Sequence, residues 1–131
     1  MFYSLVDQAY HGDYPADGQT TASVAADLQR RHHALPPVPN TTWQLRFGHF
    51  VGYGARYYSY LMSRAVAARL WQQCFRAEPF SRRAGDRYRQ SLLVHGGQVA
   101  PAQLVHDALG QRPDTDMLVQ AVLDDISHDD Q

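Results

Sequence analysis

A stretch of 21 residues, from Ala55 to Phe75, contains neither glycine nor proline and is apolar around most of a helical circumference. One face would carry Tyr57, Leu61, Arg64 and Ala68, a second would carry Tyr58, Met62, Ala65, Arg69 and Gln72, and Val66, Leu70 and Phe75 add apolar cover. A helix with apolar residues on so many sides needs packing partners in several directions. We therefore expect a long helix over residues 55–75, stopped by Pro79 and buried in a larger body.

The rest of the chain also shows helical spacing, and no alternating stretch is long enough for a strand. Helices are predicted at 2–11, 20–33, 43–50, 81–95, 101–109 and 113–127. Their candidate caps are Thr20, Thr21 or Ser23, then Thr41 or Thr42, then Ser81. Residues 13–19 should form a loop, and the prolines of 35–39 a stiff extended strut. The predicted fold class is all-α, with about six helices.

Composition fits one globular domain of 131 residues with a net charge of −1, which does not favour binding to nucleic acid or to an acidic membrane. The clustered arginines Arg76, Arg82, Arg83, Arg87 and Arg89 are interpreted as a solvated helix face. No apolar stretch reaches the ~20 residues of a membrane span, and no signal-peptide pattern is visible. The single cysteine, Cys74, excludes an internal disulfide and is expected to be a small buried apolar residue.

The candidate functional side chains lie mainly in the block His49–Tyr60, whose twelve residues include one histidine, four tyrosines and two glycines. Tyr57 and Tyr60 are three residues apart and would share a helical face. Gly52 and Gly54 flank Tyr53, so the block predicts a glycine-rich loop that enters a helix lined with phenol hydroxyls. Such tyrosines either supply bulk to a core or donate hydrogen bonds to a carbonyl oxygen that gains charge in a transition state.

Spacing alone does not decide between these interpretations, but a long and compositionally unusual run of residues surrounds the block. It comprises Leu35-Pro36, Val38–Thr41, Trp43–Phe47, His49, Gly52–Ala55 and Tyr57–Ala67, with looser continuations at Asp7-Gln8, Tyr10–Gly12, Asp86–Arg89 and His95–Gly97. This run resembles the substrate-binding segment of the thimet oligopeptidase family of zinc metallopeptidases, and within it the mitochondrial intermediate peptidase branch. The resemblance implies that His49 contacts the substrate backbone, that Tyr60 hydrogen-bonds the oxyanion with Tyr57 beside it, and that Tyr53 lies on a loop that closes on substrate.

That family holds zinc with a His-Glu-x-x-His helix and a further glutamate, and this pattern is missing here. No two of the seven histidines are four residues apart, and Glu78 is the only glutamate. The resemblance therefore implies that residues 1–127 are the C-terminal portion of a larger catalytic domain, followed by a frayed tail at 128–131. The complete enzyme would bind zinc through residues outside this chain.

Three functions are compatible with the sequence. The first is the substrate-binding part of a zinc metalloendopeptidase in the mitochondrial matrix, which removes an octapeptide from precursor proteins, as the resemblance implies. By itself such a chain would be inactive, because nothing in it can hold the metal. The second is a helical module that binds peptides without catalysis, and the third is an assembly subunit that docks through exposed apolar helix faces.

Overall fold

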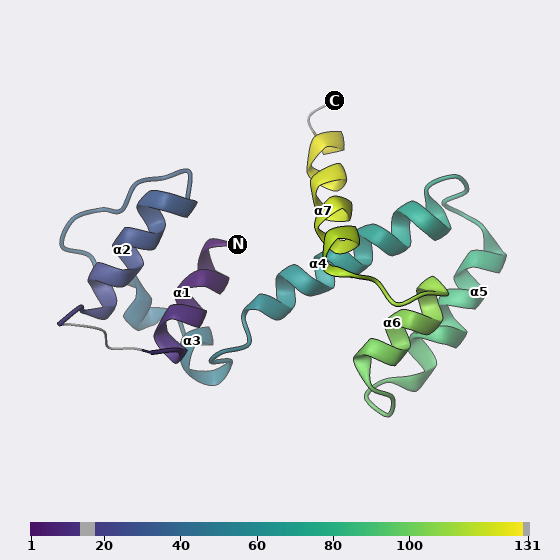
Figure 1. Ribbon diagram of the computed structural model, residues 1–131, viewed down its shortest axis with the longest axis horizontal. Coiled ribbons are helices and arrows are strands. Elements are labelled where there is room, and N and C mark those ends of the chain that lie inside the picture. Colours follow the sequence, from purple (N-terminus) through teal and green to yellow (C-terminus); the bar gives the residue numbers. More distant parts are fainter. Residues whose placement is uncertain (14–17, 130–131) are drawn as a thin grey trace. The chain divides into compact units, whose positions relative to one another are not determined.

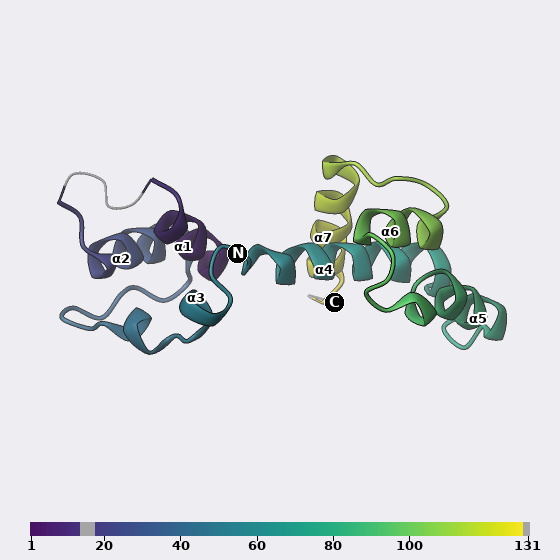
Figure 2. The same ribbon diagram turned by 90° about the horizontal axis from the view of Figure 1, so that it is seen from below.

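The chain is all-α, as predicted. A computed structural model describes residues 1–13 and 18–129, and these ranges contain seven α-helices and no strand (Figures 1 and 2). The helices are α1 (Phe2–His11), α2 (Thr21–His32), α3 (His49–Gly52), α4 (Tyr58–Leu70), α5 (Arg82–Ser91), α6 (Pro101–Leu109) and α7 (Thr115–Asp129). Most of the predicted loop 13–19 and the end of the predicted tail lie outside the described residues. None of the described helices is long and apolar enough to cross a membrane.

The chain divides into two compact units, here called the first unit (Met1–Leu61) and the second unit (Met62–Gln131). The core of the first unit is formed by Phe2, Val6, Ala25 and Phe50, with Tyr10, Leu28, Trp43 and Phe47 packed against it. These residues come from α1, α2, α3 and the short 3-10 helix Trp43–Arg46. Aromatic rings therefore supply most of the volume of this core.

The first unit shows which of the candidate caps operates. Thr20 caps α2: its hydroxyl accepts from the Ser23 amide at 3.1 Å, and the Ser23 hydroxyl accepts from the Thr20 amide at 2.9 Å. This reciprocal pair satisfies two amide donors at the helix start. Thr42 precedes the 3-10 helix without a side-chain cap bond, and the Thr41 hydroxyl donates to the Val38 carbonyl instead.

The long helix predicted over 55–75 is the main correction. It begins three residues later than expected, at Tyr58, and after Leu70 it continues as a π-helix over Trp71–Phe75. Its start is delayed because Ala55 has a φ of 60° and because the side chain of Asp7 accepts the amides of Ala55 and Tyr57. Hydrogen bonds to Asp7 of α1 thus take the place of the first helical turn that was expected at residues 55–57.

The core of the second unit is smaller and mostly aliphatic. Leu70, Ala108 and Leu109 are buried, and Val66, Cys74, Tyr88, Leu92 and Val105 pack against them. The π-helix contributes two side-chain bonds, from Gln72 to the Ala121 carbonyl at 3.3 Å and from Gln73 to the Leu109 carbonyl at 2.7 Å. Cys74 is free and half-buried against this core, in keeping with its predicted apolar role.

Helix ends in the second unit lie close to the predicted stops. Gly110 follows α6 with a φ of 76°, the left-handed conformation. The helix predicted over 81–95 is divided: α5 ends at Ser91, the 3-10 helix Leu93–His95 follows, and Gly96 then has a φ of 51°. Ser81 precedes α5 but makes no side-chain cap bond.

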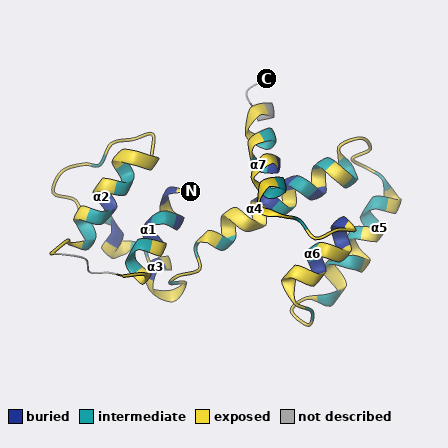
Figure 3. Cartoon of the chain, in the orientation of Figure 1, coloured by how far each residue is buried: buried dark blue, intermediate teal, exposed yellow. Residues whose placement is uncertain are grey.

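Several large apolar residues of α4 are exposed, and the first turns of this helix are coloured as exposed in Figure 3. Tyr58, Leu61, Met62 and, just after the helix, Trp71 are between 38% and 51% exposed. This agrees with the expectation that the segment 55–75 needs more packing partners than the chain itself supplies.

Candidate functional site

The structure brings the four predicted side chains together in one place, here called the His–Tyr cluster (His49, Tyr53, Tyr57 and Tyr60). His49 begins α3, Tyr53 directly follows α3, Tyr57 directly precedes α4, and Tyr60 lies in the first turn of α4. The ring centroid of His49 lies 6.5 Å from that of Tyr53, 5.7 Å from that of Tyr57 and 6.2 Å from that of Tyr60. The rings of Tyr57 and Tyr60 are 4.9 Å apart, so these two side chains are neighbours, although Tyr57 lies just before α4 and not on a helical face.

The cluster has a buried side and an open side. Tyr57 is half-buried, with its ring 5.6 Å from Phe47 and 5.8 Å from Tyr3. In contrast, Tyr60 is 53% exposed and Tyr53 is 36% exposed. Tyr57 therefore supplies core bulk as well as a hydroxyl, whereas Tyr60 and Tyr53 present their phenols to whatever binds there.

Burial shifts the pKa of the Tyr57 hydroxyl. Desolvation, followed by the neighbouring phenols of Tyr60 and Tyr3, raises the pKa of the Tyr57 hydroxyl above its ordinary value of 10.0. The hydroxyl can donate a hydrogen bond at neutral pH, as an unshifted phenol also could. Nearby, the hydroxyls of Tyr53 and Ser59 lie 3.0 Å apart, which ties the loop after α3 to the start of α4.

Two residues that position this cluster were not assigned a role in it from the sequence. Asp7 of α1 is fully buried and accepts hydrogen bonds from the amides of Ala55 at 3.1 Å and Tyr57 at 2.9 Å. His11 is the last residue of α1, and its Nδ1 lies 2.8 Å from the Asp7 carbonyl oxygen and 3.2 Å from Asp7 Oδ1. A signal was present, because Asp7 and His11 are four residues apart and share a helical face.

The two predicted glycines have different surroundings. A Cβ on Gly52 would meet no atom within 4 Å. A Cβ on Gly54 would lie 2.5 Å from Nε2 of His11 and 3.1 Å from the Phe50 carbonyl oxygen, so the backbone passes close to α1 at this point.

The residues present do not fit a zinc ion. Within 1–13 and 18–129, no group of three or more histidine, cysteine, aspartate or glutamate side chains is arranged to hold a metal. In the His–Tyr cluster, His49 is surrounded by aromatic rings rather than by carboxylates or further imidazoles.

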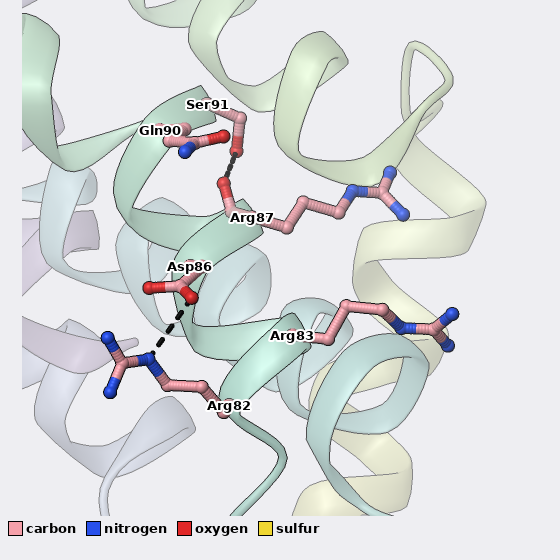
Figure 4. A pocket seen from close by; sticks show the side chains of 6 residues that line it. All are labelled: Arg82, Arg83, Asp86, Arg87, Gln90 and Ser91. Atoms are coloured by element: carbon pink, nitrogen blue, oxygen red, sulfur yellow. Dashed lines mark hydrogen bonds and ion pairs between the residues drawn. The ribbon is translucent and has the colours of Figure 1, made fainter.

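The arginines of α5 do not converge on one point (Figure 4). Arg82 extends to one side of the helix and donates to Asp86 at 3.1 Å, whereas Arg83 and Arg87 extend to the other side. The Arg82 side chain is 91% exposed, so its ion pair with Asp86 contributes little to stability. This arrangement agrees with a solvated helix face.

Comparison with known proteins identifies the family. The model of peptidase family M3 matches residues 1–123. The chain belongs to peptidase family M3. It is 50% identical over 129 residues to mitochondrial intermediate peptidase of Homo sapiens, a match that covers 98% of the chain and 18% of that relative. It is 36% identical over 111 residues to the Arabidopsis thaliana enzyme of that name, which covers 85% of the chain and 16% of the relative.

The family model therefore covers almost all of this chain, whereas the alignments cover only a small share of each relative. The chain spans less than a fifth of the length of these curated proteins. The M3 segment contains the whole His–Tyr cluster and the residues of α1 that position it. The all-helical fold and the M3 match agree with the family resemblance stated from the sequence.

Proposed function

We propose that this chain is the substrate-binding part of an M3 metalloendopeptidase that processes mitochondrial precursor proteins by removing an octapeptide. The observation that carries the proposal is the His–Tyr cluster, in which one imidazole and three phenols lie together within an M3 segment, with Tyr53 and Tyr60 on its open side. The relatives' names place them in mitochondria, so we extend a location in the mitochondrial matrix to this chain as part of the proposal.

Each residue of the cluster has a role in this proposal. His49 contacts the peptide backbone near the bond that is cut, and Tyr53 holds the peptide from the loop beside Gly52 and Gly54. Tyr60, which is more exposed than Tyr57, donates its hydroxyl hydrogen to the carbonyl oxygen as negative charge develops there. Tyr57 supports Tyr60 at a ring distance of 4.9 Å, and burial raises the pKa of its hydroxyl.

The metal ligands of the complete enzyme would lie in the part of the protein that this chain does not cover. The described residues offer no metal site, so we assign them only substrate binding and hydrogen-bond donation. The exposed apolar residues of α4 then have a natural partner, because the remainder of the catalytic domain would cover them.

The proposal is tested in a chimera in which this chain replaces the 129-residue region of human mitochondrial intermediate peptidase to which it is 50% identical. We expect the chimera to cleave a precursor peptide. Tyr60→Phe should lower kcat by about 10²–10³ with little change in KM, because a donor to a transition-state oxyanion is removed. His49→Ala should act in the same direction with a smaller effect.

The matched control is Tyr58→Phe, which removes the hydroxyl of an exposed tyrosine outside the His–Tyr cluster and should leave kcat unchanged. Equal effects of Tyr60→Phe on kcat and KM would show that Tyr60 only packs. A folded chimera that binds the peptide but does not cleave it would contradict the catalytic proposal and favour a peptide-binding module.

A further inference from the structure

The carboxylate of Asp7 is fully buried, although burial of an unpaired charge is strongly unfavourable. It is stabilised by two backbone donors on a distant segment, the amides of Ala55 and Tyr57, which lie 48 and 50 residues further along the chain. Each carboxylate oxygen takes one of these amides: Oδ1 accepts from Ala55 and Oδ2 from Tyr57. The carboxylate therefore spans the connection between α3 and α4.

The backbone that Asp7 holds is strained. Ala55 has a φ of 60°, a left-handed conformation that is unfavourable for a residue with a Cβ. A neighbouring residue of α1 stabilises the same position, because the side-chain amide of Gln8 donates to the Ala55 carbonyl at 3.2 Å. Residues of α1 thus take both the amide and the carbonyl of Ala55, and within the connection itself the Arg56 amide donates to the Tyr53 carbonyl at 3.2 Å.

His11 completes the contact from the other side. Its Nδ1 faces Asp7, at 3.2 Å from Oδ1, and its Nε2 faces Gly54, where a Cβ would approach to 2.5 Å. Gly54 does not have a positive φ, so glycine is needed here for the close approach of the imidazole and not for its backbone conformation.

We propose that Asp7 and His11 are positioning residues that fix the connection Gly54–Tyr57 to α1 and thereby set Tyr57 and Tyr60 against His49. Tyr57 connects Asp7 directly to the His–Tyr cluster. Asp7 accepts the amide of Tyr57, and the ring of Tyr57 lies 5.7 Å from that of His49 and 4.9 Å from that of Tyr60. The catalytic consequence rests on the proposed function, whereas the positioning itself is a property of this chain alone.

The first test is amide hydrogen exchange, measured by NMR on the full 131-residue chain. Asp7→Asn preserves the size of the side chain but turns one acceptor into a donor that faces an amide. Protection of the Ala55 and Tyr57 amides should fall roughly tenfold to a hundredfold relative to amides in α2. Val6→Ala is the control, because it weakens the same helix in the core without touching the connection, and it should leave that ratio unchanged.

A second variant tests the same contact if Asp7→Asn does not fold. Gly54→Ala places a methyl group against His11 and should loosen the connection, with loss of the NMR proximity signals between the His49 and Tyr57 rings. Gly48→Ala is its control, because that position has an ordinary helical conformation and open space around it. Adding His11→Ala to Gly54→Ala should restore part of the ring proximity by making room for the methyl group.

The functional test uses the chimera described above. Asp7→Asn should lower kcat more than it raises KM, whereas Val6→Ala at a matched loss of stability should leave kcat unchanged at a temperature where the protein is folded. Unchanged exchange ratios in both Asp7→Asn and Gly54→Ala would overturn the inference, even if Tyr60→Phe is inactive. Changed ratios with full activity of Tyr60→Phe would instead overturn the proposed function and leave the positioning intact.

Discussion

The connection between α3 and α4 in the first unit and the connection between α6 and α7 in the second unit both contain a glycine at a critical point, for different reasons. Gly54 is required because an imidazole from α1 lies against it, although its own φ is not positive. Gly110 is required because its φ of 76° is left-handed, although the only close neighbour of an added Cβ would be the flexible tip of Arg87 at 3.3 Å. The connection between α3 and α4 thus depends on a contact with α1, whereas the connection after α6 depends on the backbone conformation of Gly110.

The same difference appears in what holds each unit together. The first unit combines an aromatic core with a buried carboxylate whose partners are backbone amides. The second unit relies on a few small and aliphatic residues, and its helices end close to local glycine and proline signals. Polar contacts therefore determine the shape of the candidate site, whereas apolar packing mainly determines the stability of the second unit.

The largest effect expected in the second unit comes from its core. Leu109 is 2% exposed, so Leu109→Ala should lower the free energy of unfolding by about 2–5 kcal/mol through lost burial and the cavity that remains. Native-state hydrogen exchange of the α6 amides measures this loss. Leu93→Ala, at a side chain that is 53% exposed, should change the same quantity by less than about 0.5 kcal/mol. Similar losses for both variants would show that the second unit has no packed core at Leu109.

A smaller loss of stability is expected when Gly110 or Gly54 is replaced by alanine, and its cause should differ between the two positions. Gly110→Ala should cost about 1–2 kcal/mol, because an alanine is forced into the left-handed region. Removing the nearby side chain with Arg87→Ala should not recover this loss, because the strain lies in the backbone. Gly54→Ala, in contrast, should respond to His11→Ala. Thermal unfolding of the four variants checks this difference, and recovery of Gly110→Ala by Arg87→Ala would contradict it.

Much of this architecture could be predicted from local sequence signals. Helical spacing and cap signals predicted six of the seven described α-helices, and Gly110 and Pro101 mark the ends of α6 where they were expected. The single helix expected over 43–50 was wrong: the structure has a 3-10 helix over Trp43–Arg46 and a separate α3 that extends to Gly52. The meeting of Tyr57 and Tyr60 followed from their three-residue spacing, and the resemblance added His49 and Tyr53 to the same site. These predictions succeed because each depends on residues close together in the chain.

What could not be predicted depends on contacts between distant residues. Nothing in residues 55–57 indicates that their amides bind a carboxylate about fifty residues earlier, so the helix was expected to begin at Ala55 rather than at Tyr58. The role of Gly54 was missed in the same way, because it depends on where His11 lies. The four-residue spacing of Asp7 and His11 predicts that the two side chains share a helical face. It does not predict that Asp7 binds the amides of Ala55 and Tyr57.

The smallest effect concerns the pKa of Tyr57 and tests whether its hydroxyl belongs to the buried side of the His–Tyr cluster. Burial and the phenols of Tyr60 and Tyr3 raise this pKa above 10.0, so folding favours the neutral phenol. The stability it contributes is fully present below the unfolded-state pKa, near 10.0, and is lost as the pH rises through the higher folded-state pKa. Wild type should therefore lose more stability than Tyr57→Phe over that alkaline range.

An NMR titration of the Tyr57 ring checks the direction of the shift at the residue itself. Tyr60→Phe and Tyr3→Phe should each bring the Tyr57 pKa back toward 10.0, because each removes a neighbouring group that becomes negative on ionisation. Desolvation is the larger cause, so the shift should persist in part when both are replaced. An ordinary pKa in wild type would mean that water reaches the Tyr57 hydroxyl, and the cluster would then be open on both sides.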